Sequence, residues 1–171
     1  NHQRMFYAYT YDDRYHSLVT SVRDAYGYSS STAYDGLWNA PSVTTDLNGQ
    51  KMEYTYDALG RQQTIRAPYE IESGQPFTIR FEYFPAERKA HTIHYSKDGN
   101  IDTYTFADSL MRAVQTKQTG VVWSGGSNQK VSIVSGRAVI DAFGRNIAAY
   151  YPMTESHGNI GTYNHATGDL Q

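Results

Sequence analysis

The chain has 171 residues and a formal net charge of −2. This length suffices for one domain with a hydrophobic core, and the charge gives no electrostatic reason to bind nucleic acid or an anionic membrane. Because there is no cysteine, disulfides and cysteine-bound metals are excluded, and no apolar run approaches the roughly 18 residues of a transmembrane helix.

Tyrosine is the residue type that stands out, with 16 copies against 6 phenylalanines and 2 tryptophans. Tyrosine fits the half-buried surface of a pleated sheet better than a helix interior, so the composition predicts β-structure. The chain starts at Asn1 without a basic, apolar leader, so we expect a mature product or a piece of a longer protein.

Aspartates recur at a nearly constant interval near the start, at positions 12, 24, 35, 46 and 57. A glycine stands three residues after four of the chain's aspartates, in the pairs Asp24 and Gly27, Asp46 and Gly49, Asp57 and Gly60, and Asp141 and Gly144. A type I turn favours aspartate first and glycine fourth, and the glycine takes a positive φ that permits a one-residue bulge. The period of about 22 residues, in two halves of about 11, therefore predicts tandem antiparallel β-hairpins.

The intervals between these turns alternate in the way that strands do. Met52, Tyr54 and Tyr56 share one face of the strand expected over 52–56, and apolar and polar residues alternate over 77–83. No segment shows a 3.6-residue apolar period over three turns. We expect an all-β fold in which the hairpins form one curved, open sheet with one polar face.

Two insertions interrupt the repeat. Residues 67–76 carry two prolines and a Ser-Gly pair, which predicts an exposed loop. Residues 119–130 predict a longer hairpin or a disordered tip around two adjacent glycines. The repeat sheet is thus expected over 1–152, and the polar stretch 153–171 is expected to be an irregular tail or an incomplete repeat.

The core Tyr-x-Tyr-Asp-x-x-Gly-Arg, led by a glycine about eight residues before its aspartate, resembles the Rhs/YD-repeat family. The residues that carry the first match are Tyr54, Tyr56, Asp57, Gly60 and Arg61, with Gly49 ahead of them. The second half of the core returns as Asp141, Gly144 and Arg145, and weaker copies lie at 9–12, 33–35 and 104–106, the last led by Gly99.

Two turns depart from the family pattern. The stretch FADSLMR has Met111 at the glycine position, and FEYFPAER has Phe84 and Glu87 where the aspartate and glycine would fall. We expect both turns to be built differently from the others. The family's C-terminal self-cleavage region is also missing, so autoproteolysis is not implied.

The resemblance implies hairpins that join into one long, spiralling antiparallel sheet. In bacterial Rhs proteins and toxin-complex components such a sheet closes into a shell around a toxic C-terminal domain, and teneurins carry a similar shell on animal cell surfaces. By this resemblance the chain is a non-enzymatic section of shell wall, secreted or at the cell surface. Its implied partners are the rest of a parent chain and an enclosed toxin or effector domain.

Catalytic and metal-binding interpretations find little support in the sequence. Asp12 and Asp13 are adjacent, so on a strand they would point to opposite faces and could not act as a glycosidase pair. His91 and His94 would also face opposite sides, which disfavours a shared metal. The glycine-rich stretch 124–130 lacks the Gly-Lys-Ser/Thr of a phosphate loop. We therefore expect no enzyme activity and no cofactor.

Aromatic side chains support an alternative function, a carbohydrate- or protein-binding β module. Trp123 and Trp38 are its candidate ligand contacts, because flat aromatic rings stack on sugars and occur often at interfaces. Tyr54 and Tyr56 are expected instead to pack against cross-strand neighbours. A section of a longer sheet also has two unpaired edges, so the isolated chain is expected to self-associate.

Overall fold

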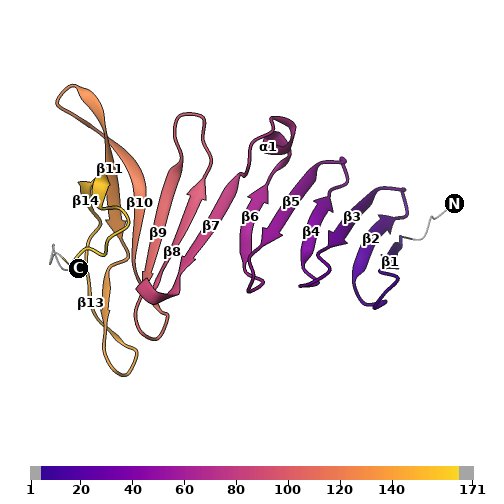
Figure 1. Cartoon of the computed structure of the whole chain (residues 1–171), viewed down its shortest axis with the longest axis horizontal. Helices are drawn as coiled ribbons and strands as arrows, with labels where there is room; N and C mark the ends of the chain where they lie inside the picture. The colour runs from indigo at the N-terminus through magenta and orange to yellow at the C-terminus, as the bar shows by residue number, and fades with distance from the viewer. Residues whose placement is uncertain (1–4, 166–171) are drawn as a thin grey trace. The chain divides into compact units, whose positions relative to one another are not determined.

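The all-β prediction is confirmed: the computed structural model, which describes residues 5–165, is a succession of antiparallel strands (Figure 1). The first strands are β1 (Tyr7–Tyr11), β2 (Val19–Asp24), β3 (Ser29–Tyr34), β4 (Pro41–Thr45), β5 (Lys51–Tyr56), β6 (Gln62–Arg66) and β7 (Ile79–Phe84). The later strands are β8 (Lys89–His94), β9 (Ile101–Ala107), β10 (Ala113–Ser124), β11 (Ser127–Ser135), β12 (Ala138–Ile140), β13 (Asn146–Ala149) and β14 (Met153–Ser156). The helical segments are α1 (Pro68–Glu72) and the single-turn 3₁₀ helices η1 (Pro85–Glu87) and η2 (His157–Asn159).

Twelve strands pair in chain order from β1 to β11, with β14 added beside β11, and β12 and β13 form a separate two-stranded sheet. This order is what consecutive hairpins produce, because each strand pairs with the strand before it and the strand after it. The sheet is open, with β1 and β14 as its end strands.

The described residues divide into two compact units, one up to Arg80 and one from Phe81. Among residues 5–80 of the first unit, Phe77 is the one apolar side chain that is buried, and the Arg80 guanidinium lies 5.0 Å from the centre of its ring. In the second unit the buried apolar side chains are those of Ile93, Phe106 and Val134. Buried polar side chains accompany them, namely His91, Gln115, Lys117 and Ser132.

The tyrosines are less buried than a tyrosine-packed core would require. No tyrosine is among the buried side chains of residues 5–165, and Tyr7, Tyr9 and Tyr11 are 65%, 54% and 49% exposed. The physical reason is that the described part of the first unit supplies a single sheet and one short helix. A single layer leaves most of its rings half-covered by neighbours on adjacent strands.

The prediction of a loop over 67–76 is wrong in part, because α1 lies within it. Pro68 occupies the first helical turn, where its missing N–H and fixed φ are favourable. The Thr78 hydroxyl donates to the Glu70 carboxylate at 2.6 Å and accepts from the backbone N–H of Ala67 at 2.7 Å. These long-range bonds, which local composition does not encode, fix the segment against the start of β7.

The stretch expected to be an irregular tail or an incomplete repeat contains a strand and a 3₁₀ helix among its described residues, which end at 165. Its strand β14 pairs antiparallel with β11, and η2 follows directly. Residues 166–171 lie outside the described residues. In the other insertion, β10 and β11 form a long hairpin whose turn holds Gly125 and Gly126, both at positive φ.

Candidate functional site

One hydrogen-bonded turn recurs along the chain, and Asp57 shows its geometry. The backbone N–H of Gly60 donates to the carbonyl of Asp57 at 3.0 Å, and the N–H of Asp57 donates to the carbonyl of Arg61 at 2.8 Å. One carboxylate oxygen of Asp57 accepts from the N–H groups of Leu59 and Arg61 at 2.9 and 3.0 Å. Gly60 has φ +76°, so the arrangement is a type I turn followed by a glycine bulge.

The same set of bonds closes four other hairpins. The turns opened by Asp24, Asp46, Asp108 and Asp141 each have the carbonyl bond from the fourth residue and two carboxylate bonds to backbone N–H groups. Gly27, Gly49 and Gly144 take positive φ in these turns, as Gly99 does in a related turn opened by Ser96. Since one local arrangement satisfies the backbone at each of these five ends, these hairpins share one turn geometry.

An arginine clamps the aspartate in three of these turns. The guanidinium of Arg61 reaches the second carboxylate oxygen of Asp57 through Nε and Nη2, each at 2.7 Å. The pairs Asp108–Arg112 and Asp141–Arg145 repeat this two-bond contact. The hydrogen bonds from Arg112 lower the pKa of Asp108, so this carboxylate stays ionised and keeps its acceptor role in mild acid.

Asp12 opens a wider turn in which its carboxylate accepts from the N–H groups of Tyr15, Ser17 and Leu18. Partial burial raises the pKa of Asp12, but these backbone donors outweigh it and lower the pKa from 3.8 to about 2. A lowered folded-state pKa contributes stability that is present above the ordinary pKa and is lost as the pH falls towards the folded value.

We therefore expect the melting temperature of the chain to fall between about pH 5 and pH 2, the range that spans the two pKa values of Asp12. Calorimetry across this range measures the effect. The Asp12→Asn variant, which cannot ionise at this position, should show a shallower decline than the wild type. Identical declines in both proteins would show that the Asp12 carboxylate does not take part.

The turn at Asp108 corrects a prediction. Met111 stands at the glycine position, yet its N–H donates to the Asp108 carbonyl at 3.0 Å and its φ is +61°, so this turn is built like the others. The methionine therefore bears the strain that glycine avoids elsewhere. The second departing turn is different as expected, because η1 replaces the aspartate turn there and Arg88 follows at φ +50°.

Replacing Met111 with glycine should raise the free energy of unfolding by about 1 kcal/mol, because it removes the left-handed strain of a side chain that is 68% exposed. Urea denaturation measures the change. Leu110→Gly is the matched control, since Leu110 is equally exposed in the same turn but has no positive φ. A loss of stability in Met111→Gly as large as that in the control would contradict this account.

Two tyrosines that directly precede a turn aspartate form a hydrogen bond across the open end of a hairpin, the end away from its turn. The hydroxyl of Tyr34 donates to the carbonyl of Val19 at 2.8 Å, and that of Tyr56 donates to the carbonyl of Pro41 at 2.7 Å. The two tyrosines lie 22 residues apart, so the contact repeats with the hairpin period. Burial raises the pKa of Tyr56, which keeps its hydroxyl protonated as a donor. Tyr54 lies on β5 within 3.3 Å of the Thr44 hydroxyl.

The two tryptophans proposed as ligand contacts have different surroundings. Trp123 is 71% exposed near the tip of the β10–β11 hairpin. Trp38 is 39% exposed and packs against the turn that lies one 22-residue period later, where a Cβ added to Gly60 would meet its ring at 2.7 Å. Sequence reasoning missed this contact because the two residues lie in separate turns of the period.

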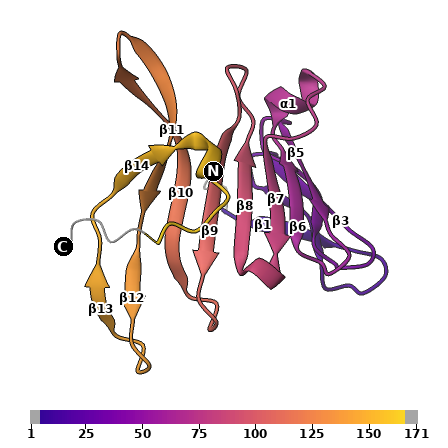
Figure 2. The same ribbon diagram turned by 60° about the vertical axis from the view of Figure 1, so that its left-hand side comes forward.

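A second cluster lies on the face of β8–β11, where the chain after β14 crosses the strands (Figure 2). We call residues 157–165 the strap. The surface beneath the strap is called the strapped face and consists of Lys89, His91, Tyr104, Phe106, Gln115 and Lys117. Opposed residues of an antiparallel pair share a face, and the register pairs Phe106 with Lys89 and Gln115, and Tyr104 with His91 and Lys117.

Buried charge on the strapped face is compensated within the unit. Lys117, 1% exposed, forms an ion pair with Glu155 of β14, whose other oxygen accepts from the Asn164 amide at 2.7 Å. His91 stacks on Tyr104 at 4.0 Å between ring centres and lies 3.0 Å from the carboxylates of both Glu82 and Asp102. Polar residues alternate along β10 as they do in a solvent-facing strand, so no sequence signal shows that Gln115 and Lys117 are covered.

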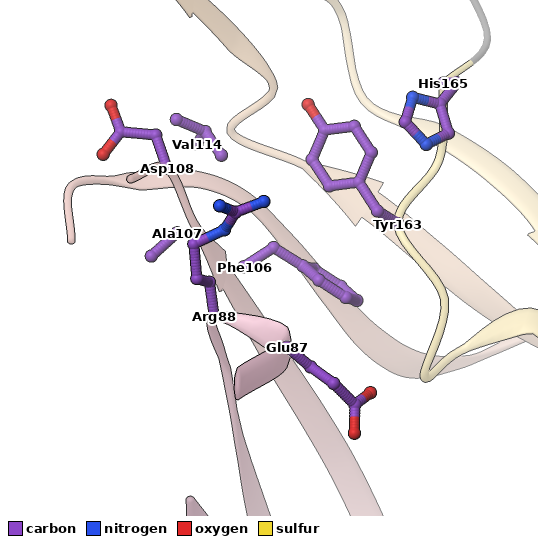
Figure 3. A pocket seen from close by; sticks show the side chains of 8 residues that line it. All are labelled: Glu87, Arg88, Phe106, Ala107, Asp108, Val114, Tyr163 and His165. Atoms are coloured by element: carbon purple, nitrogen blue, oxygen red, sulfur yellow. The ribbon is translucent and has the colours of Figure 1, made fainter. Parts of the chain in front are cut away.

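A pocket of about 350 Å³ lies beside the strap. Tyr163 and His165 line it from the strap, Phe106 and Val114 line it from β9 and β10, and Arg88 lines it from the turn between η1 and β8 (Figure 3). Within residues 5–165 no group of three or more histidine, aspartate or glutamate side chains is arranged to hold a metal ion, and no helix there could cross a membrane.

No protein-family model and no curated protein matches the chain. Among solved structures, a crystal structure of TcdB2-TccC3 aligns with a TM-score of 0.70 and 21% sequence identity, over 86% of this chain and 10% of that one. The same complex without its hypervariable C-terminal region aligns with a TM-score of 0.69 and 18% identity, and the Photorhabdus luminescens Tc holotoxin pore with 0.68 and 18%. Each of these two alignments covers 86% of this chain and 12% of the other.

The chain thus spans about a tenth of the chains that it matches. At these identities the likeness concerns the fold. The chain has the β-hairpin repeat fold of these toxin-complex structures, and the Rhs/YD-repeat architecture that its aspartate turns indicate is confirmed.

Proposed function

We propose that the chain is a non-enzymatic structural segment of a larger Rhs/YD-repeat protein, where it forms part of a β-shell that encloses or presents a toxin or effector domain. The observation that carries the proposal is the repeated aspartate turn within a fold that matches about a tenth of much longer toxin-complex chains. The same relation supports a secreted or cell-surface location and the rest of the parent chain as the first partner.

The geometry suits a wall because five of the hairpins are closed by the same local aspartate turn. Aspartate satisfies the turn at one end, and at two hairpins a tyrosine hydroxyl fastens the other end. Strands can therefore be added in series without a separate core for each, since the ladder of backbone bonds continues from one hairpin to the next.

Intact mass spectrometry of the polypeptide in its native source tests the proposal. We expect a product many times larger than 19.3 kDa that contains further YD repeats and a variable C-terminal domain. A native product of about 19.3 kDa would overturn the proposal, because a section of this size cannot enclose a domain.

The isolated chain is also expected to self-associate through its end strands, because β1 has one unpaired edge and its residues are all exposed. Light scattering over a range of concentrations should show dimers or larger species. Ala8→Lys places a charge on β1 and should reduce the association. A monomer at high concentration in the wild type would contradict this expectation.

The exposure of Trp123 favours a second candidate, carbohydrate or protein binding through aromatic side chains. Trp38 contributes less to this candidate, because its ring covers Gly60. Saturable binding on a glycan panel that is lost in Trp123→Ala and kept in Trp38→Ala would support it. Absence of binding across the panel would remove it.

A further inference from the structure

The β10–β11 hairpin extends beyond the strand that lies beside it (Figure 1). The register of β9 with β10 ends at the pair Thr103 and Gln118, whereas β10 and β11 stay paired up to their own turn. At the end of the β9 ladder a side chain takes over, because the backbone N–H of Asp102 donates to the Thr119 hydroxyl at 3.1 Å. Residues 119–124 of β10 therefore run past the end of β9 with their side chains accessible beside the β8–β9 turn.

A pocket of about 400 Å³ lies between this projecting part of the hairpin and the turn that joins β8 to β9. Its volume is in the range of small-molecule sites. Apolar side chains of β9 and β10 line it together with polar side chains of the turn and of β11, among them Ile101, Val121, Asp98, Asn128 and Lys130. The pocket thus offers apolar contact and hydrogen-bonding groups to one ligand.

Trp123 lies on the same face of the hairpin as this pocket. Opposed residues of an antiparallel pair share a face, and the register pairs Val121 with Lys130 and Trp123 with Asn128. Val121, Lys130 and Asn128 line the pocket, and Trp123 follows Val121 two positions along β10. The short side chain opposite Trp123 leaves its ring 71% exposed. The indole therefore continues the apolar side of the pocket towards the tip of the hairpin.

The hydrogen-bonding capacity of the pocket is not used by the protein. Within residues 5–165, the side chains of Asp98, Asn128 and Lys130 form no hydrogen bond or ion pair. They provide carboxylate acceptors, an amide that donates and accepts, and an ammonium donor. The negative and the positive charge offset each other, which favours a neutral ligand.

A sugar ring has the matching chemistry. Its C–H groups form an apolar face that stacks on an aromatic ring, and its hydroxyl groups both donate and accept hydrogen bonds. We propose that this pocket, together with the Trp123 ring, is a binding site for a neutral saccharide, with the sugar stacked on Trp123 and its hydroxyl groups bonded to Asp98, Asn128 and Lys130. This inference rests on the second candidate function, to which it gives a defined site and a ligand class, and it does not depend on the role in a shell wall.

The test is calorimetric titration of the full chain with short neutral oligosaccharides of glucose, galactose, mannose or N-acetylglucosamine. We expect at least one of them to bind saturably, and Trp123→Ala and Asn128→Ala each to weaken this binding about tenfold or more. Gln129→Ala is the matched control, because Gln129 is the exposed neighbour of Asn128 on β11 and points to the opposite face. Its binding should stay within about twofold of the wild type.

Two outcomes separate this inference from the candidate function on which it rests. Binding that is lost in Trp123→Ala but unchanged in Asn128→Ala would overturn the pocket site and leave the candidate standing, since the ring would then act without the pocket. If no oligosaccharide binds saturably, the site and the carbohydrate-binding candidate both fail. The substituted side chains are exposed, so the variants should keep the fold, which circular dichroism checks.

Discussion

Replacing Gly60 with alanine is expected to lower the free energy of unfolding by about 2–4 kcal/mol, one of the largest effects of a single methyl group in this chain. Two causes add. Gly60 has φ +76°, which costs a residue with a side chain about 1–2 kcal/mol. The new Cβ would also lie 2.7 Å from the Trp38 ring, so the ring has to shift. Urea denaturation gives the difference from the wild type.

Gly49 provides a matched control for this prediction. It occupies the same position in the preceding D-x-x-G turn, with φ +79°, but a Cβ added there meets nothing within 4 Å. Gly49→Ala should therefore show the backbone cost alone, about 1–2 kcal/mol. Adding Trp38→Ala to Gly60→Ala should remove the steric part. Equal losses in Gly49→Ala and Gly60→Ala would refute the contact between Trp38 and the Gly60 turn.

Neutralising Glu155 with Glu155→Gln should destabilise the second unit by about 3 kcal/mol, because it leaves the Lys117 charge buried without its carboxylate. Chemical denaturation followed by a signal from the second unit measures the loss. The double variant Lys117→Met with Glu155→Leu removes both charges and should be less destabilised than Glu155→Gln.

The ion pair between Lys89 and Glu87 is the control that shows how much of the expected loss depends on burial of the charges. Its carboxylate is 59% exposed, so Glu87→Gln should cost less than about 1 kcal/mol. A similar loss in Glu87→Gln and Glu155→Gln would mean that burial of Lys117 does not set the size of the effect.

The aspartate turns were predictable from the sequence because each is formed by hydrogen bonds between residues close together in the chain. The carboxylate of Asp57 binds N–H groups two and four residues ahead, and Gly60 supplies a backbone conformation that other residues resist. Everything that specifies such a hairpin end lies within about five residues. The fold class follows from the repetition of that local rule, since consecutive hairpins of one period pair in chain order.

Features in which specific contacts override the local preference were not predictable. Met111 adopts the glycine conformation because the surrounding bonds of the Asp108 turn, including the Arg112 clamp, tolerate its strain. Segment α1 depends on a hydroxyl eight residues beyond Glu70. Propensity alone could not show that these tertiary contacts outweigh the local preference.

The strapped face was missed for a related reason. Gln115 and Lys117 alternate along β10 as solvent-facing residues do, and their burial comes from Glu155 and Asn164, which lie 38 and 49 residues away. The polar composition of the strap predicted an irregular tail. A polar segment is covered here because the face beneath it offers side-chain donors for its backbone.

The most direct test of the account is a cryo-EM reconstruction of the native polypeptide that contains this chain. Density is expected for a further strand hydrogen-bonded along the free edge of β1, on the side away from β2. A native sheet in which β1 is the outermost strand, with solvent along its edge, would contradict the claim that this chain is a section of a larger wall.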